Sequence, residues 1–289
     1  MTRLSEALAG KEFVITAELS PRKGTLVTNF IKTVHALQGK VHAINITDNQ
    51  RAIMRMSSLA ASYLVLREGM EPIYQITCRD RNRLAIQSDL IGASALGIKN
   101  VLALTGDHPS VGDSPEAKPV FDLDATTLLH TITRLNAGSD LDGHPLKGAT
   151  DLFPGAALTP QTEPLEPVLL TMERKISAGA RFFQTQPVFD MDAFRSFATL
   201  TGRFGTPVIV GILLLHSAQQ AQDLNAGVPG IKIPDVMIRR LGEAADPRRE
   251  GIDIAAELIR SARNIAQGVH IMTVGQEKDL PVLLERISG

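Results

Sequence analysis

Eight short apolar runs alternate with helical patterns along the 289-residue chain, and this rhythm constrains the fold more than any other feature. The runs are rich in valine, isoleucine and leucine and lack strict polar–apolar alternation, which is typical of parallel strands covered on both faces. They span residues 12–19, 43–47, 73–78, 100–104, 155–158, 181–185, 208–215 and 269–274. Helical spacing of apolar residues occurs at 52–67, 83–96, 125–135, 165–178, 191–200 and 252–266. This order predicts a parallel α/β fold.

Helix boundaries support the same reading. Asp124 and Asp190 stand where N-caps are expected, and Gly97 and Gly179 stand where helices should stop. Eight strands in one chain of this length favour a single-domain (β/α)8 TIM barrel over residues 1–289, with a doubly wound sheet as the alternative. Aromatic residues make up only 4% of the chain and tryptophan is absent, so aliphatic side chains must fill the core. Two loops are expected. The loop at 108–121 follows the fourth strand, where barrel loops build active sites, and the loop at 137–154 lies on the surface.

Charge and cysteine content exclude several classes of protein. The 30 basic and 31 acidic residues leave a net charge of −1, which argues against nucleic-acid binding and membrane-surface binding. A single cysteine, Cys78, cannot form a disulfide framework, which favours a reducing compartment. No apolar run approaches the ~20 residues of a membrane helix, and the first residues lack a signal-peptide core. We therefore expect a cytoplasmic protein.

Polar residues interrupt the apolar runs near the ends of the strands. Glu18 lies near the end of the first run, Gly106 and Asp107 follow the fourth, and Gln186 follows the sixth. A partly desolvated carboxylate suits proton transfer near neutral pH, and an amide can both donate to and accept from a heterocycle. Taken singly, Glu18 could equally be a rim residue and Asp107 a turn residue. Because the carboxyl ends of barrel strands meet on one face, their convergence predicts a small-molecule site.

The sequence lacks the motifs of several common classes of metal-binding, nucleotide-binding and hydrolytic site. The seven histidines are scattered and no cysteine cluster occurs, so no metal site is expected. The Gly-x-Gly-x-x-Gly fingerprint, the Walker loop and the Gly-x-Ser-x-Gly elbow are absent. Dinucleotide binding of the Rossmann type, P-loop chemistry and serine-hydrolase chemistry are therefore disfavoured.

Taken in order, the strand-end segments resemble the methylenetetrahydrofolate reductase family over almost the whole chain. The matching segments are Ala-Glu-Leu-Ser-Pro at 17–21, Ala-Leu-Thr-Gly-Asp at 103–107 and Arg-Lys-Ile-Ser-Ala-Gly-Ala at 174–180 with its downstream Thr-Gln and Phe-Asp. The segment Asn-Ile-Thr-Asp-Asn-Gln at 45–50 is similar to the compact form of the family found in anaerobic one-carbon metabolism.

The resemblance implies a reductase that converts 5,10-methylenetetrahydrofolate to 5-methyltetrahydrofolate with FAD, FMN being the alternative. It implies Glu18 as the catalytic acid and Asp107 as the carboxylate between flavin and pterin. It also implies Gln186 and Gln276 as substrate-binding residues. The positions implied for the cofactor are Thr47, Gln75, Thr105, Gly106, Asp107, Gly155, Thr159, Arg174 and Lys175. The compact form often works with a second, electron-delivering subunit, so a partner subunit and an oligomer are expected.

The chain departs from the family pattern at several of these positions. Gln75 stands where the familiar enzyme has a histidine, Gln276 where it has an arginine, and Gly155 and Thr159 where it has tyrosine and histidine. Three other readings therefore stay open. One is a flavin-free reductase that takes hydride from a free nicotinamide cofactor, one is a subunit that docks an electron-transfer partner, and one is a pterin methyltransferase barrel.

Overall fold

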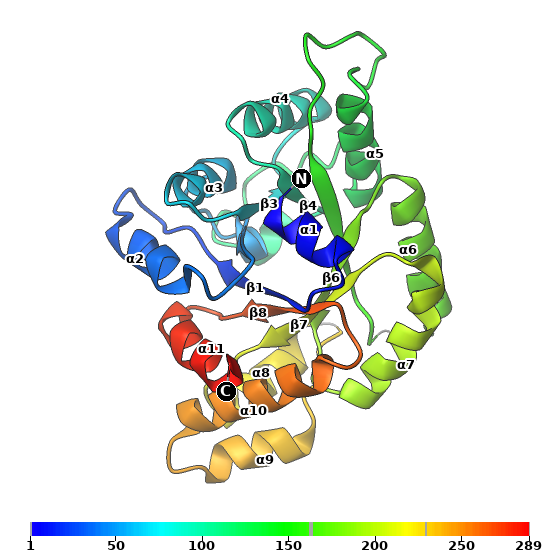
Figure 1. Ribbon diagram of the computed structural model, residues 1–289. Helices are drawn as coiled ribbons and strands as arrows, with labels where there is room; N and C mark the ends of the chain where they lie inside the picture. Colours follow the sequence, from blue (N-terminus) through cyan, green and yellow to red (C-terminus); the bar gives the residue numbers. More distant parts are fainter. Residues whose placement is uncertain (1, 162–163, 229, 289) are drawn as a thin grey trace.

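The computed structural model describes residues 2–161, 164–228 and 230–288, and the eight expected strands close into one parallel barrel. Each strand pairs with its neighbours in sequence, and β1 closes the ring by pairing with β8 (Figure 1). The strands are β1 Val14–Leu19, β2 Ala43–Ile46, β3 Pro72–Thr77, β4 Asn100–Leu104, β5 Phe153–Leu158, β6 Phe182–Pro187, β7 Val208–Leu213 and β8 Gly268–Met272. The predicted TIM barrel is confirmed, and the doubly wound alternative is wrong.

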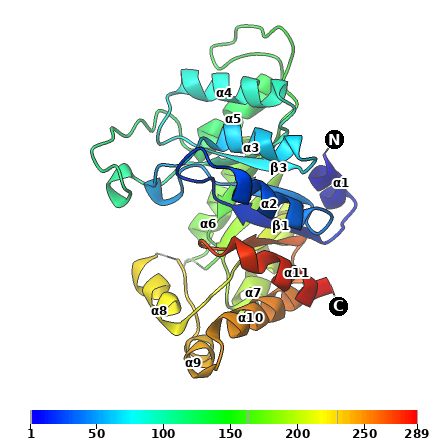
Figure 2. The same cartoon turned by 90° about the vertical axis from the view of Figure 1, so that its left-hand side faces the viewer.

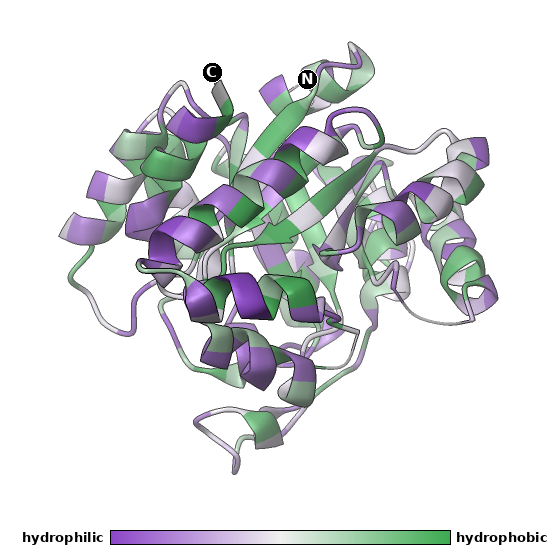
Figure 3. Ribbon diagram, turned by 90° about the horizontal axis from the view of Figure 1, so that it is seen from below, coloured by the Kyte–Doolittle hydropathy of each residue, from purple (hydrophilic) through white to green (hydrophobic). Residues whose placement is uncertain are grey.

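Helices surround the barrel, with their apolar faces turned toward the strands and polar residues outward (Figure 3). The helices are α1 Arg3–Ala9, α2 Thr28–Leu37, α3 Ser58–Arg67, α4 Arg83–Ala95, α5 Ala125–Asn136, α6 Glu166–Ser177, α7 Met191–Thr201, α8 Ala218–Gly227, α9 Asp235–Glu243, α10 Pro247–Ala262 and α11 Leu280–Ser288. Short 3₁₀ helices are η1 Gln50–Ala52, η2 Pro109–Val111, η3 Gly202–Phe204 and η4 Glu277–Asp279. None of the helices in the described part of the chain is long and apolar enough to cross a membrane.

The predicted capping residues act as expected. The Asp124 side chain accepts a hydrogen bond from the backbone of Thr127, and Asp190 accepts from the backbone of the first turn of α7. Gly97 and Gly179 follow the ends of α4 and α6 with φ of 89° and 118°. These left-handed conformations favour glycine, so the chain turns from each helix toward the next strand without steric cost.

Two helix boundaries differ from the sequence prediction. The helix predicted from 52 begins only at Ser58, because Arg51 and Ala52 adopt positive φ and Ile53 is extended. There the Met56 backbone N–H donates to Arg22 and the Met54 N–H to Asp113, so tertiary contacts replace helical bonds. The predicted 252–266 helix is α10, which begins earlier, at Pro247, and ends at Ala262. Helices α1, α2, α8, α9 and α11 were not predicted.

The two ends of the barrel are built differently. Helix α1 covers the end where the strands begin, whereas α8 and the loop after β4 lie at the opposite end (Figure 2). Leu4, Ala7 and Leu8 of α1 join the inward-facing residues of the strands in a separate apolar cluster. The loop at 105–124 packs on η1, where a Cβ on Gly112 would lie 1.9 Å from the Ala52 carbonyl oxygen. The open end is therefore the one where the carboxyl ends of the strands meet.

Candidate functional site

The barrel interior is layered, with an apolar floor and a polar layer above it. Successive side chains of a strand point to opposite faces, so residues two apart share the interior. The floor consists of Val14, Ala43, Ile73, Leu102, Phe182 and Ile209, plugged by α1. Two residues further along four of these strands stand the buried polar residues Thr16, Asn45, Gln75 and Gln184, and His270 of β8 contacts the first two of them. Interiors of such barrels usually hold bulky aliphatic residues, so this polar layer marks the site.

Glu18 lies directly above this layer on β1 and is only 8% exposed. Its Oε1 accepts a hydrogen bond of 3.2 Å from the Gln50 side-chain amide. Its Oε2 lies 3.7 Å from Nε2 of His270 on β8, a separation longer than a hydrogen bond. The predicted acid is therefore a buried carboxylate with one amide donor and one imidazole beside it.

A chain of side-chain contacts orients the His270 ring. Gln75 donates from Nε2 to Asn45 Oδ1 over 3.4 Å, and this contact orients the Asn45 amide so that its NH₂ group points to Nδ1 of His270 at 3.2 Å. The Thr16 hydroxyl lies 3.1 Å from the same Nδ1 and can either donate or accept. With the Asn45 amide assigned in this orientation, its NH₂ group donates to Nδ1, which places the ring proton on Nε2. His270 therefore turns an N–H toward Glu18. The sequence prediction missed His270 and Gln184, which lie within apolar runs.

Thr47, one of the predicted cofactor residues, lies at the end of β2 and is fully buried. Its hydroxyl donates to the Ser20 hydroxyl over 3.1 Å, so the side chain ties the ends of β1 and β2 together. Gln75 lies in the interior layer described above. Both predicted residues are thus at the barrel mouth or inside it, where they support neighbouring polar groups.

A buried ion pair closes the rim between β2 and β3. Asp48, which directly follows Thr47 at the end of β2, accepts from the backbone and hydroxyl of Thr77, both over 2.9 Å, and from Arg81 over 2.8 Å. Burial alone would lower the pKa of the Arg81 guanidinium, but the hydrogen bond and charge of Asp48 outweigh it and raise the pKa. Asp48 is therefore committed to a clamp between strands.

The loop after β4 carries the second predicted carboxylate. Gly106 has φ 93°, and a Cβ there would lie 3.0 Å from Cβ of Thr77. Asp107 follows with an exposed side chain, while its carbonyl oxygen accepts a 3.4 Å hydrogen bond from Arg79. Thr105 accepts from the first N–H of α5 through its hydroxyl. The turn thus holds the Asp107 carboxylate at the open end of the barrel.

A pocket of about 380 Å³ lies between the ends of β4 and β5 and helices α5 and α6. Thr105, Thr159 and Lys175 supply polar groups to its wall, and Leu104 and Leu158 supply apolar ones. Lys175 donates to the Ala157 carbonyl over 2.7 Å, and no carboxylate of the described residues forms an ion pair with it. Burial lowers the pKa of Lys175, and the charge of Asp124 offsets this only in part. The pocket therefore offers a poorly compensated cation to an anionic ligand.

The remaining predicted residues are more dispersed. Arg174 is exposed and does not line the pocket, although its neighbour Lys175 does. Gly155 is buried in β5, where a Cβ would lie 2.3 Å from the Phe182 ring, so the ring occupies that space. Gln186 is exposed at the end of β6, and Gln276 is partly buried just before η4. Gln186 thus lies on the open end of the barrel, whereas Gly155 lies in the packed interior.

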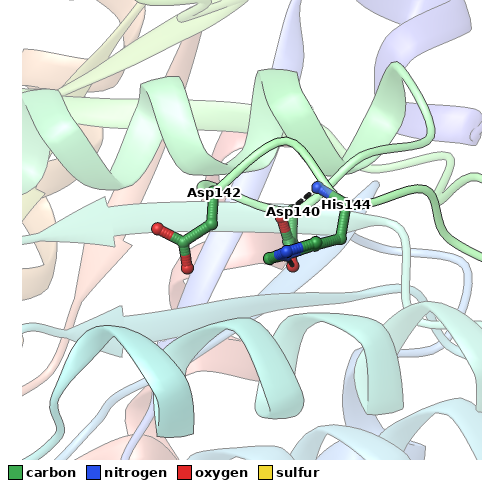
Figure 4. Close-up of side chains that lie close together, drawn as sticks. All are labelled: Asp140, Asp142 and His144. Atoms are coloured by element: carbon green, nitrogen blue, oxygen red, sulfur yellow. Dashed lines mark hydrogen bonds and ion pairs between the residues drawn. The ribbon is translucent and has the colours of Figure 1, made fainter.

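Within the described part of the chain, one group of side chains has ligand atoms close enough together to hold a metal ion (Figure 4). It consists of Asp140, Asp142 and His144 on the loop between α5 and β5. Asp140 accepts from the His144 backbone over 2.7 Å and lies 3.0 Å from the ring Nδ1, which are the contacts of a tight turn. Asp142 and His144 are exposed, and this loop leads into the start of β5, away from the open end. The group is separate from the candidate site.

Comparison with known proteins assigns the barrel to a family. A model of the methylenetetrahydrofolate reductase family matches residues 3–288. The chain belongs to the methylenetetrahydrofolate reductase family. The resemblance seen in the sequence is thereby confirmed.

Curated relatives of this reductase-family chain are distant. The 5,10-methylenetetrahydrofolate reductase of Salmonella typhimurium is 25% identical over 217 residues, covering 73% of this chain and 68% of that protein. Methylenetetrahydrofolate reductase 2 of Schizosaccharomyces pombe is 24% identical over 232 residues, and the match covers 34% of its length. The chain thus spans about a third of the yeast relative.

A solved structure shares the fold over the full length. A protein from Clostridium thermocellum that binds two copies of 5-methyl-5,6,7,8-tetrahydrofolic acid has a TM-score of 0.67 and 16% sequence identity. The superposition covers 99% of this chain and 98% of that one. At this identity, the likeness supports the fold of the reductase-family barrel.

Proposed function

We propose that the protein catalyses the flavin-dependent reduction of 5,10-methylenetetrahydrofolate to 5-methyltetrahydrofolate. The observation that carries the proposal is Glu18, a carboxylate 8% exposed at the barrel mouth with His270 and Gln50 beside it. Membership of the reductase family supports the reaction class, and the bacterial relatives carry the same name. A buried carboxylate with access to the open end suits the proton transfer that this reaction requires.

In the proposed mechanism, Glu18 gives a proton to N10 of the folate, directly or through water. Protonation opens the five-membered ring and leaves an iminium cation at N5. His270 is a positioning residue, because its Nε2–H faces the carboxylate while Asn45 fixes the ring. Asp107 stabilises the iminium by its negative charge at the open end, and Gln186 orients the pterin through its amide.

The pocket beside β4 and β5 suits part of a flavin nucleotide. Among the described residues, the partner of Lys175 is the Ala157 backbone carbonyl, and a phosphate would provide a counter-charge. Thr105 and Thr159 offer hydroxyl groups on the same wall. When bound, a reduced flavin supplies the hydride that converts the iminium to a methyl group. The protein's own residues bind the phosphate, orient the pterin and move the proton.

An anaerobic visible spectrum of the protein incubated with FAD or FMN tests the proposal. Addition of 5-methyltetrahydrofolate should bleach the flavin band, because hydride passes from the methyl group to the flavin in the reverse direction. The assay does not depend on the electron donor, whether a nicotinamide cofactor or a partner subunit. A bound flavin that stays oxidised would contradict the folate half of the proposal. Activity with NADH or NADPH and no bound flavin would favour the flavin-free reductase instead.

A further inference from the structure

A second cleft opens at the end of the barrel opposite Glu18, where the strands begin. Its volume is about 900 Å³, compared with about 380 Å³ for the pocket beside Lys175. The walls come from α1, the first residues of β5, the ends of α6 and α7, and the segment after α10. Helix α1 lies over this end of the barrel (Figure 1), so the cleft is remote from the proposed reaction.

Three cationic side chains line this N-terminal cleft, and none of the lining residues that the structure describes is acidic. Lys11, Arg181 and Arg263 form no ion pair with any described carboxylate. Glu12 is adjacent to Lys11 in the sequence, but its Oε1 lies 3.2 Å from Nε2 of His42 instead. Arg263 stacks 4.9 Å above the Phe13 ring and donates to the Ile287 carbonyl. Among the described residues, the cleft therefore gathers three cations without a compensating carboxylate.

The floor between these cations is apolar. Phe13, Phe153 and Ile176 line it, together with Leu8 and Val208. The Phe153 ring stacks on Phe182 of the barrel interior at 5.4 Å between centroids, which holds it in place. A ligand that matches this surface needs an apolar body of ring size and an anionic group that can reach the surrounding cations.

We propose that the N-terminal cleft is a second ligand site, which binds a small organic anion with an aromatic or aliphatic ring body. The volume lies within the range of pockets that bury small molecules. Charge complementarity selects the anion, and the apolar floor selects a ring-bearing anion over inorganic phosphate. The site is distinct from the proposed reaction, because its residues come from the opposite end of the strands.

The test uses 8-anilinonaphthalene-1-sulfonate, an aromatic anion whose fluorescence rises in apolar surroundings. We expect saturable binding that weakens about threefold in each of Arg181→Gln and Arg263→Gln, and about tenfold in the double variant, as for exposed charge contacts. Arg203→Gln is the matched control, because Arg203 lies over the Phe204 ring at 4.8 Å and does not line the cleft. Lys175→Gln controls for binding of the probe in the other pocket.

Two comparisons make the result decisive. N-phenyl-1-naphthylamine, the uncharged analogue of the probe, should bind more weakly and be insensitive to the arginine variants. Equal affinity of both probes, or equal affinity of the double variant and the parent protein, would overturn the proposal. Probe binding that is lost as the protein concentration rises would show that a second copy of the chain covers the cleft, and would also overturn it. Circular dichroism melting confirms that each variant is folded.

Discussion

At the scale of single residues, the chemistry of this barrel depends on where the strand period places polar groups. Glu18 and His270 lie on β1 and β8, which pair with each other, and both point into the barrel. Asn45 completes the arrangement from β2. Since buried polar groups are costly unless they are hydrogen-bonded, such a cluster is retained where it serves binding or chemistry.

Replacing Glu18 with glutamine should separate the two halves of the reaction. Glu18→Gln keeps the size of the side chain and its contact with Gln50 but removes the proton donor. We expect normal flavin binding and reduction, with folate reduction slowed by roughly 100-fold or more, the contribution of a general acid. Stopped-flow spectroscopy of each half-reaction measures both rates. Folate reduction at the parental rate would remove Glu18 from the mechanism.

Lys175 should make stability depend on pH. Its pKa is lowered in the native state by burial, whereas in the unfolded chain it stays near 10.5. Between these two values the unfolded state binds more protons, so the free energy of unfolding rises with pH across that window. The Lys175→Met variant should therefore be more stable relative to the parent at pH 7 than at pH 10, by urea unfolding. A pH-independent difference would contradict the burial of this ammonium group. The variant should also bind flavin more weakly.

At the scale of elements, packing inside the barrel decides which positions are open to a ligand. The start of β6 places Phe182 against β5, and its ring fills the space where a side chain at Gly155 would lie. Phe153 stacks on the same ring from the beginning of β5. The glycine in β5 is therefore required by the ring on the neighbouring strand.

The Gly155→Ala variant should be destabilised by about 1–3 kcal/mol, the range for overpacking a filled interior. Phe182→Leu in the same chain should recover part of that loss, because it removes the ring that the new methyl group meets. Chemical unfolding of the two single variants and the double variant measures the coupling. Additive losses would show that the two positions do not share space. Flavin affinity of Gly155→Ala tests separately whether this position contacts the cofactor.

At the scale of the whole molecule, the barrel has one closed end and one open end. Helix α1 closes the first with Leu4, Ala7 and Leu8, which are all buried. The loops after β1, β2 and β4 frame the second, where the carboxylates lie. This division places the proposed reaction and the proposed anion site at opposite ends of the same strands.

Truncating a buried side chain of α1 should lower the stability of the whole barrel. Leu4→Ala deletes a fully buried side chain and should lower the free energy of unfolding by about 2–5 kcal/mol. Leu84→Ala is the matched control, since Leu84 is 72% exposed on α4 and should change stability by less than about 0.5 kcal/mol. Urea unfolding followed by circular dichroism compares them. Equal effects of the two substitutions would show that α1 adds nothing to the core.

The sequence by itself determined the barrel, its eight strands and the order of the groups at its mouth. It could do so because parallel strands buried on both faces need continuous apolar runs, and because helix caps such as Asp124 act locally. The five missed helices are only 7 to 10 residues long, although α2 and α11 do carry apolar residues at helical spacing. The positions of Glu18 and Asp107 at strand ends were also predicted from the neighbouring residues in the sequence alone.

Only the tertiary structure decided which side chains meet. His270 lies in a run that reads as apolar, and the pairing of β8 with β1 brings its ring beside Glu18. The rotation of α6 decided that Lys175, and not Arg174, lines the pocket. Asp48 forms an ion pair with Arg81 because Arg81 follows β3, the strand next to β2. These outcomes depend on register and helix rotation, which are set by contacts between segments far apart in the chain.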